Sequence, residues 1–374
     1  MKIGIYAPYL ETYGGGEKYI CTIAKMLSEN HDVELITCDK VNTKELKDRL
    51  NINLGKVVLR RIKIPSLFKK LPYLHQLMRI IAISRITKEY DLFINQEHFS
   101  IIPSLAKRSV LICEVPPAKQ NKSLFNIILA LFFDPQLKSY DKIITNSFYT
   151  RNWVLKYYKK KVEVLYPPVD VNAFSPLPKQ NIILNVGRFF RNQHCKKQLE
   201  MIKIFKELYS EAEELKTWEF HLVGGISTKI EDQKYLQLCL REAQNYPVFF
   251  HINVPFRVLR ELYGKGKIYW HATGLYENEE KTPEGMEHFG ITIVEAMSAG
   301  CVPVVINRGG PREIIRNGID GFLWNTPKEL KEYTIKLVND QVLWKRMSEA
   351  SIKRSREFST ERFREQLKHV LELE

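Results

Sequence analysis

The stretch MKIGIYAPYLETYGGGEKYICTIAKMLSENHDVELIT, residues 1–37, decides the fold class. Residues 3–6 open as a short apolar strand, and the glycines at 14–16 interrupt it. Apolar residues then recur at helical spacing over 20–27, and residues 33–37 form an apolar run typical of a buried strand. Strand, helix and strand at this spacing predict a parallel sheet with a crossover helix.

A second series of the same kind follows the segment YPPVDVNAFSPLPK, residues 166–179. Its four prolines cannot continue a helix or an inner strand, so we place a domain junction here. Beyond it, the pattern predicts strands at 182–186, 220–223, 248–254, 268–271 and 302–306, and helices at 199–208 and 291–299. The chain is therefore expected to be an α/β protein with two Rossmann-like domains whose parallel sheets face a cleft.

The predicted domains are residues 1–168, residues 169–355, and a C-terminal helix over 356–374 that returns to the first domain. Open parallel sheets bind ligands beyond the carboxyl ends of their strands, so functional residues are expected there.

The charge of the chain is unevenly distributed. The 374 residues carry a formal net charge of +14, which invites a nucleic-acid or anionic-membrane interpretation. Residues 51–200 hold 25 Lys and Arg against 9 Asp and Glu, whereas the rest of the chain is nearly balanced. An apolar content of 44% argues against disorder.

The cysteines, the first residues and the longest apolar run indicate the cellular compartment in which the protein is expected. None of the six cysteines forms a CxxC pair, so reduced thiols in a cytosolic protein are expected rather than a disulfide framework or a zinc site. The start, MKIGIYAPYL, does not read as a secretory leader. The longest apolar run, 124–133, is ten residues, and a membrane-spanning helix needs about 20.

The densest chemical signal is EHFGITIVE, Glu287 to Glu295, followed by AMSAGCVPVV. Gly290 stands where a helix should begin, so its neighbours present free backbone N–H groups that suit a phosphate. Glu295 lies on the same helix and can accept both hydroxyls of a ribose, and Glu287 precedes the helix and can contact a sugar. A helix-start acid and a solvated glutamate are the alternative interpretation.

In this setting E-x7-E resembles the retaining nucleotide-sugar glycosyltransferases of family 4, which have the GT-B fold. The resemblance covers nearly the whole chain, with YPPVDVNAF at the linker, NVGRF after the first strand of the second domain, and VPFRVLRELY before IYWHATGL. It is strongest over 269–315, which is most similar to mannosyltransferases that extend dolichol-type lipid-linked oligosaccharides.

The resemblance implies that an Arg and a Lys hold the donor diphosphate. Arg188 matches the Arg, and Lys196 is our choice for the Lys, with Lys197 the alternative. Breaking a sugar–phosphate bond places negative charge on the leaving diphosphate, which fixed cations stabilise. The chain offers no D-x-D pair at a strand end, so we expect no metal ion and no cofactor beyond the donor itself.

The glycines at 14–16 fail a dinucleotide fingerprint, because position 19 is Tyr. The family resemblance places Gly15 and Gly16 near the donor phosphate and the acceptor, and a plain turn is the alternative. Relatives often carry a His before two prolines in this domain, whereas ICEVPP puts Glu114 in that slot. His98 is the other candidate for the polar role, and the choice between the two stays open.

Further donor-binding residues follow from the resemblance. His288, Phe289, Gly290 and Ile291 lie at the start of the E-x7-E helix, and the nucleobase is expected near Gly224, Val254, Pro255 and Phe256. Backbone groups usually recognise the base in this fold, so the sequence favours GDP-mannose only weakly over UDP-sugars.

Residues 64–85 mix Leu, Phe and Ile with Lys and Arg, and 124–133 are strongly apolar. This composition is typical of an interfacial segment, with cations for anionic headgroups; helices packed on the sheet are the alternative. We therefore expect a peripheral protein on the cytoplasmic membrane face.

Three functions are compared. The first is a retaining transferase that moves a hexose from a nucleotide-sugar to a lipid-linked glycan. The second is the same transfer to a soluble acceptor such as a sugar phosphate. The third is a non-catalytic protein that binds nucleotide-sugar or nucleic acid. No nucleic-acid module is recognised, so nucleic acid is not expected as a partner.

Overall fold

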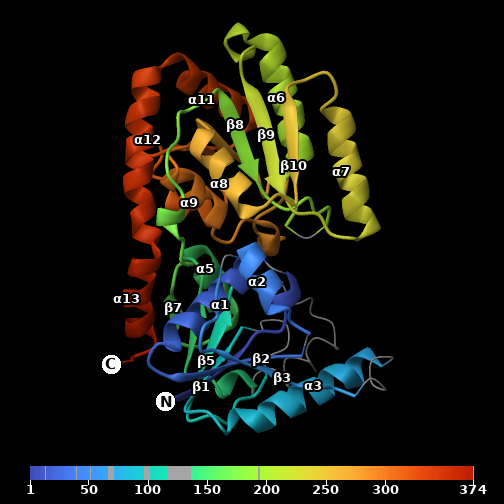
Figure 1. Ribbon diagram of the computed structural model, residues 1–374, viewed down its shortest axis with the longest axis vertical. Helices are drawn as coiled ribbons and strands as arrows, with labels where there is room; N and C mark the ends of the chain where they lie inside the picture. Colours follow the sequence, from blue (N-terminus) through green and yellow to red (C-terminus); the bar gives the residue numbers. More distant parts are fainter. Residues whose placement is uncertain are drawn as a thin grey trace. The chain divides into compact units, whose positions relative to one another are not determined.

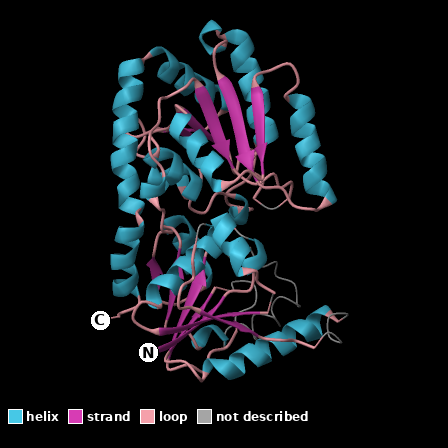
Figure 2. Cartoon of the chain, in the orientation of Figure 1, coloured by secondary structure: helices cyan, strands magenta, loops and turns pink. Residues whose placement is uncertain are grey.

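The computed structural model describes residues 1–12, 14–38, 40–50, 52–65, 71–96, 102–116, 136–192 and 194–373. They form two compact units: unit 1 joins Met1–Tyr166 to Arg364–Glu374, and unit 2 is Pro167–Phe363. Each unit contains a sheet, magenta in Figure 2, with helices against it. No helix within these described ranges is long and apolar enough to cross a membrane.

The sheet of unit 1 has the order β3-β2-β1-β4-β5-β6-β7 within the described residues, and its strands pair in parallel. The strands are β1 (Lys2–Tyr6), β2 (Asp32–Thr37), β3 (Val58–Arg61), β4 (Leu92–Asn95), β5 (Arg108–Cys113), β6 (Lys142–Thr145) and β7 (Val162–Val164). The helices include α1 (Gly15–Leu27), α2 (Thr43–Leu50), α3 (Pro72–Thr87) and α5 (Phe148–Tyr157), and α13 (Thr360–Val370) ends in this unit (Figure 1).

The centre of this sheet explains the opening sequence. β1 pairs with both β2 and β4, and Ile3 and Ile5 are fully buried. A central parallel strand is covered on both faces, which is why it reads as a nearly continuous apolar run. The predicted strands at 3–6 and 33–37 are confirmed as β1 and β2.

The sheet of unit 2 has the order β10-β9-β8-β11-β12-β13, again with parallel pairs in the described residues. The strands are β8 (Ile182–Val186), β9 (Glu219–Gly224), β10 (Val248–Ile252), β11 (Ile268–His271), β12 (Val302–Ile306) and β13 (Phe322–Trp324). The helices are α6 (Gln198–Glu211), α7 (Ile230–Glu242), α8 (Phe256–Lys265), α9 (Ile291–Ser298), α10 (Pro311–Ile314), α11 (Pro327–Asn339) and α12 (Gln341–Ser355).

The predicted strands at 182–186, 268–271 and 302–306 coincide with β8, β11 and β12. The prediction for 248–254 was too long, because β10 ends at Ile252. Asn253 turns out of the strand with a φ of 52°, and its N–H donates to the carbonyl oxygen of Gly224. The predicted helices at 199–208 and 291–299 are confirmed as α6 and α9.

The strand order of unit 2 reverses between β8 and β11. In doubly wound sheets, ligands bind beyond the carboxyl ends of the strands at such a reversal. The segments that follow Val186 and His271 are therefore where the site of this unit belongs.

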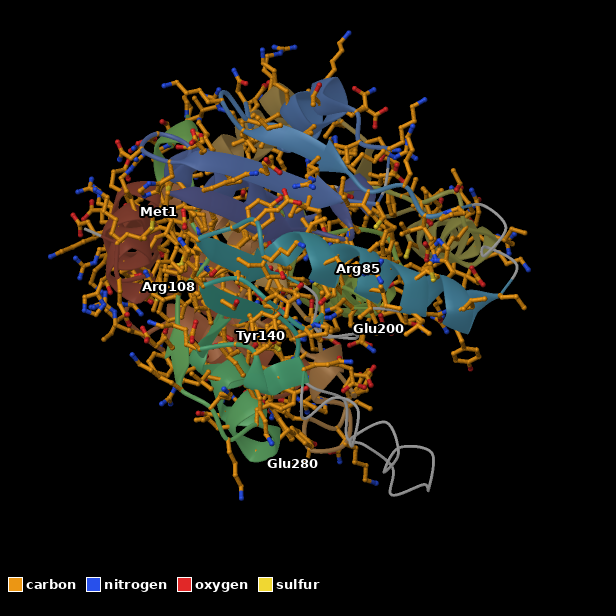
Figure 3. All side chains as sticks on the ribbon, turned by 90° about the horizontal axis from the view of Figure 1, so that it is seen from below. Met1, Arg85, Arg108, Tyr140, Glu200 and Glu280 are labelled. Atoms are coloured by element: carbon orange, nitrogen blue, oxygen red, sulfur yellow. The ribbon has the colours of Figure 1, made fainter. Side chains whose placement is uncertain are left out.

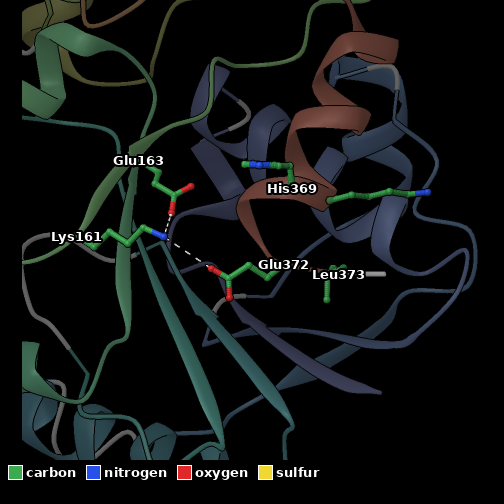
Figure 4. Close-up of a pocket in the computed structure, with 6 residues that line it drawn as sticks. Lys161, Glu163, His369, Glu372 and Leu373 are labelled. Carbon is green, nitrogen blue, oxygen red and sulfur yellow. Dashed lines mark ion pairs between the residues drawn. The ribbon is translucent and has the colours of Figure 1, made fainter.

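The C-terminal residues pair with unit 1 through a network of charges. Lys142 is buried, and its Nζ lies 2.5 Å from Glu372 Oε1, 2.8 Å from the Val370 carbonyl oxygen and 3.3 Å from Glu163 Oε1. Lys161 bridges Glu163 and Glu372 at 2.8 and 3.8 Å (Figure 4). A buried ammonium needs such partners, so these last residues form part of the fold of unit 1.

Candidate active site

The loop after β8 is shaped by close backbone packing. A Cβ at Gly187 would lie 2.6 Å from Lys196 Cγ, and a Cβ at Gly224 would overlap the carbonyl oxygen of Gly187. Gln198 Nε2 donates to the carbonyl oxygens of Gly187 and Arg188 at 3.1 and 3.2 Å. The predicted donor residue Gly224 thus has a steric reason to be glycine.

Arg188 extends from this fixed loop. Its guanidinium lies 4.6 Å from the centre of the Phe190 ring. Within the described part of the chain no carboxylate pairs with it, so its charge is not neutralised by an ion pair. Asp232 Oδ1 accepts from the Arg191 backbone N–H at 2.9 Å and holds the rest of the loop against α7.

Lys196 and Glu287, 91 positions apart in sequence, form an ion pair with 2.6 Å between Nζ and Oε2. The same oxygen lies 3.0 Å from His271 Nε2 and 3.5 Å from Thr273 Oγ1. The other carboxylate oxygen of Glu287, Oε1, accepts no hydrogen bond from any residue that the structure describes. One oxygen of Glu287 is therefore held by three donors, while the other is available to a ligand.

The electrostatics favour an ionised Glu287. Burial raises the pKa of this carboxyl, but Lys196 and His271 outweigh that effect and hold the pKa well below its ordinary value. Glu287 is therefore an anion that can only accept hydrogen bonds, as a sugar hydroxyl requires.

The two neighbouring lysines have different partners. Lys197 has a left-handed backbone with a φ of 58°, and its Nζ lies 2.8 Å from Glu277 Oε1. Lys196, by contrast, points to Glu287. The structure thus groups Lys196, the first choice for the diphosphate, with the E-x7-E glutamate; its role on the diphosphate stays a prediction.

The backbone under Glu287 is set by the glycines of the RGGP segment. Gly309 has a φ of 60°, a conformation that favours glycine, and a Cβ there would overlap the Glu287 carbonyl oxygen. The Gly310 N–H donates to that oxygen at 2.8 Å. This close approach fixes the segment from which α9 begins.

Gly290 is the residue before α9, at the predicted helix start, and its φ of 115° is a conformation that favours glycine; Ile291 is the first helical residue. The first amides of a helix have no carbonyl four residues earlier, so they are available to an anion. Glu295 is 6% exposed, and its Oε2 accepts from the Tyr263 hydroxyl at 3.1 Å. Its proposed contact with a ribose stays a prediction.

His288 and Phe289 are buried. His288 Nε2 lies 3.2 Å from the Glu284 carbonyl oxygen, and its ring packs edge-on against His194 at 4.4 Å. Burial and the neighbouring His194 lower the pKa of His288 well below its ordinary value. Phe289 packs against Phe358 at 5.5 Å. Donor contacts from these two residues are therefore expected from the backbone.

The expected base-binding segment follows β10. Asn253 Oδ1 accepts from the Ile226 N–H at 3.3 Å, which joins it to the loop after Gly224. Val254 and Pro255 come next, and Phe256 opens α8 with its ring 5.7 Å from Phe174. The structure brings these residues together but does not select a base.

Unit 1 presents a second polar cluster at the carboxyl ends of β4 and β5. Gln96 Nε2 donates to Glu114 Oε1 at 2.7 Å and to the Gly16 carbonyl oxygen at 2.8 Å. A Cβ at Gly16 would lie 2.6 Å from Glu114 Oε2, so the glycine turn lets the carboxylate approach α1. Gly15 is the first residue of α1, and His98 lies outside the described residues.

The pKa of Glu114 is raised to about 7, mainly by burial and further by Glu17, while the hydrogen bond from Gln96 lowers it. Glu17 itself caps α1, because its Oε2 accepts from the Gly14 N–H at 2.6 Å. Glu114 therefore changes charge near neutral pH.

Sequence reasoning missed Gln96, His271 and Thr273. Each stands at or just beyond the end of a parallel strand, at Asn95 or His271, and that position was the available signal. Among the described residues, no group of three or more His, Cys, Asp or Glu side chains could hold a metal ion.

Comparison with known families decides the assignment. Residues 171–354 match the family described as glycosyl transferases group 1, and residues 13–173 match Glycosyltransferase Family 4. The chain belongs to the family 4 glycosyltransferases. The E-x7-E segment, Arg188 and Lys196 all lie within the first of these matches.

The similar curated glycosyltransferases are named as mannosyltransferases. The chain is 25% identical to the GDP-Man:Man(3)GlcNAc(2)-PP-Dol alpha-1,2-mannosyltransferase of Dictyostelium discoideum, over 98% of this chain and 82% of that protein. It is 27% identical to the alpha-1,3/1,6-mannosyltransferase ALG2 of Candida glabrata, over 84% and 78%. The human alpha-1,2-mannosyltransferase is 29% identical, but the match spans 60% of this chain and 46% of that protein.

Solved glycosyltransferases share the architecture. Anabaena Alr3699/HepE, in complex with UDP and glucose, superposes with a TM-score of 0.74 at 17% identity and full coverage of both chains. A glycosyltransferase of Rickettsia africae gives a TM-score of 0.73 at 19% identity, over 100% and 99% of the two chains. These structures confirm the GT-B fold, and the family matches together with the similar mannosyltransferases confirm the assignment as a nucleotide-sugar-dependent glycosyltransferase.

Proposed function

We propose that this glycosyltransferase moves mannose from GDP-mannose to a lipid-linked glycan, with retention at the anomeric carbon. The supporting observation is the grouping of Arg188, Lys196 and Glu287 beyond the carboxyl ends of β8 and β11. The donor and acceptor classes are supported by the names of the similar mannosyltransferases. Anabaena Alr3699/HepE has been solved with UDP-glucose, so UDP-sugars are the alternative donors to test.

In this proposal the donor's charge and its sugar contact different residues. Arg188 and Lys196 stabilise the diphosphate as the anomeric carbon–oxygen bond breaks, together with the N-terminus of α9. The Oε1 atom of Glu287 accepts a hydrogen bond from a hydroxyl of the sugar. The acceptor hydroxyl forms the new bond to the anomeric carbon on the same face that the diphosphate leaves, and the hydroxyl proton passes to the leaving diphosphate. No metal ion takes part.

Transfer is tested with purified protein, GDP-mannose, UDP-glucose and UDP-GlcNAc, and a short-chain polyprenyl-diphosphate oligosaccharide as acceptor. A mannose phosphate serves as the soluble alternative. Product formation from GDP-mannose on the lipid-linked acceptor alone supports the proposal. Equal transfer to the soluble acceptor would refute the acceptor class, and transfer only from UDP-sugars would refute the donor.

We further propose that α3 attaches the protein to the cytoplasmic face of an anionic membrane. Exposed apolar side chains recur on this helix and just before it: Leu71, Tyr73, Leu74, Leu77 and Ile81, with exposed fractions of 36 to 82%. Arg85 lies on the same helix (Figure 3). Apolar residues beside cations are typical of interfacial helices.

Two other parts of the predicted interface do not contribute to this proposal. Arg79 Nη1 donates to the Tyr6 hydroxyl at 3.2 Å, so this cation is held by the sheet of unit 1. Residues 66–70 and 124–133 lie outside the described residues.

The test is flotation with vesicles containing 30% phosphatidylserine at low and high salt. Leu77→Glu is expected to abolish binding, and the matched control Val342→Glu, at an 81% exposed apolar position of unit 2, is expected to leave it unchanged. Each Lys or Arg near such a surface contributes about 1 kcal/mol, so binding should weaken as salt increases. Salt-independent binding, or equal loss in both variants, would refute a role for α3.

A further inference from the structure

His271 is a buried imidazole at the carboxyl end of β11 that no sequence motif assigned. It is 2% exposed, and its Nε2 lies 3.0 Å from Glu287 Oε2. Its other nitrogen, Nδ1, is buried without a hydrogen-bond partner among the described residues. A buried histidine with one partner, and that partner an E-x7-E glutamate, calls for a functional explanation.

The geometry fixes the protonation state of His271. The ionised Glu287 can only accept, so the hydrogen of the neutral imidazole is on Nε2. A second proton would be placed on Nδ1, where no acceptor receives it. Burial lowers the pKa of His271, and Lys196 lowers it further, against the opposing effect of Glu287. His271 is therefore a neutral donor to Glu287.

Lys196 has two possible anionic partners: Glu287, which it contacts at 2.6 Å, and the donor diphosphate that the proposed function assigns to it. If Lys196 moves toward the diphosphate, Glu287 loses its strongest partner while still largely buried. A buried charge whose partner is removed is strongly destabilised and tends to take up a proton. Thr273 Oγ1, at 3.5 Å, is too distant to compensate alone.

We propose that His271 is a positioning residue, which keeps Glu287 ionised and oriented toward the sugar when Lys196 engages the diphosphate. This inference rests on the proposed function. It assigns His271 no contact with the substrate, because the imidazole acts only through the Oε2 atom of Glu287.

Other titratable groups close to Glu287 come from the neighbouring segments. Lys196 precedes α6, His288 adjoins Glu287 in sequence, and Tyr269 lies on β11. Burial lowers the pKa of His288 and raises the pKa of Tyr269. Both shifts lead away from neutral pH, and Glu114, with a pKa raised to about 7, is the same in every variant compared, so a difference in the acid limb between the wild type and His271→Leu reports on Glu287 and His271.

The first experiment does not depend on turnover. In Lys196→Met protein, the pKa of Glu287 is measured by carbon-detected NMR of the labelled carboxyl, with and without His271→Leu. Loss of a hydrogen bond to a charged group corresponds to roughly a tenfold change, so the pKa of Glu287 is expected to be about one pH unit higher in the double variant. An equal pKa in the two proteins would refute the proposal.

The second experiment follows kcat and KM from pH 4.5 to 8. His271→Leu is expected to lower kcat roughly 10- to 100-fold and to move the acid limb to higher pH, with little change in the donor KM. His271→Gln places an amide N–H donor in the same direction and should restore the limb. His221→Leu is the matched control, because this buried histidine pairs with Glu219 at 2.9 Å instead.

The outcomes separate the two proposals. An acid limb that does not move in His271→Leu, with Gln no better than Leu and kcat falling in parallel with the unfolding temperature, would leave His271 only a packing role. If the wild-type enzyme transfers sugar and the variants give this result, only the proposal for His271 is refuted. A wild-type protein that transfers no sugar from any donor refutes the proposed function, and the NMR titration still decides whether His271 holds Glu287.

Discussion

Glu114 should make unit 1 less stable as the pH rises, and its isostere Glu114→Gln should remove this dependence. The pKa of this carboxyl is raised from 4.5 to about 7 in the folded protein, chiefly by burial. A raised pKa means that the folded state holds the proton more tightly than the unfolded state. The contribution of Glu114 to the free energy of unfolding is therefore fully present below about pH 4.5 and is lost as the pH increases through 7.

The magnitude follows from the difference in pKa of about 2.5, at ~1.4 kcal/mol for each pH unit, which gives roughly 3 kcal/mol as an upper value. Partial contact of Glu114 with solvent reduces this to about 2 kcal/mol between pH 5 and pH 8. For a unit of this size, the change corresponds to about 4–8 °C in the unfolding temperature.

The assay is differential scanning calorimetry of the full chain at pH 5, 6, 7 and 8, following the transition of unit 1. Glu114→Gln should gain stability over the wild type steadily with pH, while Glu11→Gln, at an exposed position of the same unit, should follow the wild type. Parallel curves for the wild type and Glu114→Gln across this range would refute the burial argument.

The remaining predictions concern the site and the scaffold of unit 2. Lys196→Met and Glu287→Ala should each lower kcat by 10²- to 10³-fold, as measured by donor turnover, and a loss below tenfold for both would contradict the site assignment. Gly224→Ala should prevent unit 2 from folding normally, because the added methyl group overlaps the Gly187 carbonyl oxygen. The control Gly225→Ala should fold, because its methyl group would lie 3.4 Å from Asn253 Oδ1, and circular dichroism with thermal melts distinguishes the two variants. Lys179→Met should destabilise unit 2 by about 1–3 kcal/mol in urea unfolding, because Lys179 Nζ donates at 2.7 Å to the carbonyl oxygens of Gly266 and Ala299; an unchanged midpoint would show that water replaces it.

The parts of the fold that could be predicted from the sequence are those where one physical effect dominates. β8, β11 and β12 were placed to the residue, because strands covered on both faces must be continuously apolar. The end of β10 was misplaced since Val254 continues the apolar run, and only the backbone turn at Asn253 ends the strand.

The candidate site was predictable only where residues are neighbours in sequence. Glu287, Gly290 and Glu295 could be found because a helix start imposes their spacing. The pairing of Lys196 with Glu287 depends on two loops 91 positions apart, and the role of His271 depends on a single hydrogen bond. Neither contact has a local sequence signature, although both lie where functional residues are expected once the ends of β8 and β11 are known.

The pairing of Lys142 with Glu372 has a consequence for synthesis of the chain. A ribosome releases residues 1–166 first, then all of unit 2, and only then the segment that supplies the carboxylate and the Val370 carbonyl oxygen. Until residues 370–372 have been translated, the Lys142 ammonium has no access to these partners, so unit 1 begins to be translated first but is completed after unit 2. Nascent chains stalled before residue 364 should therefore carry a protease-resistant unit 2 beside an incompletely folded N-terminal sheet.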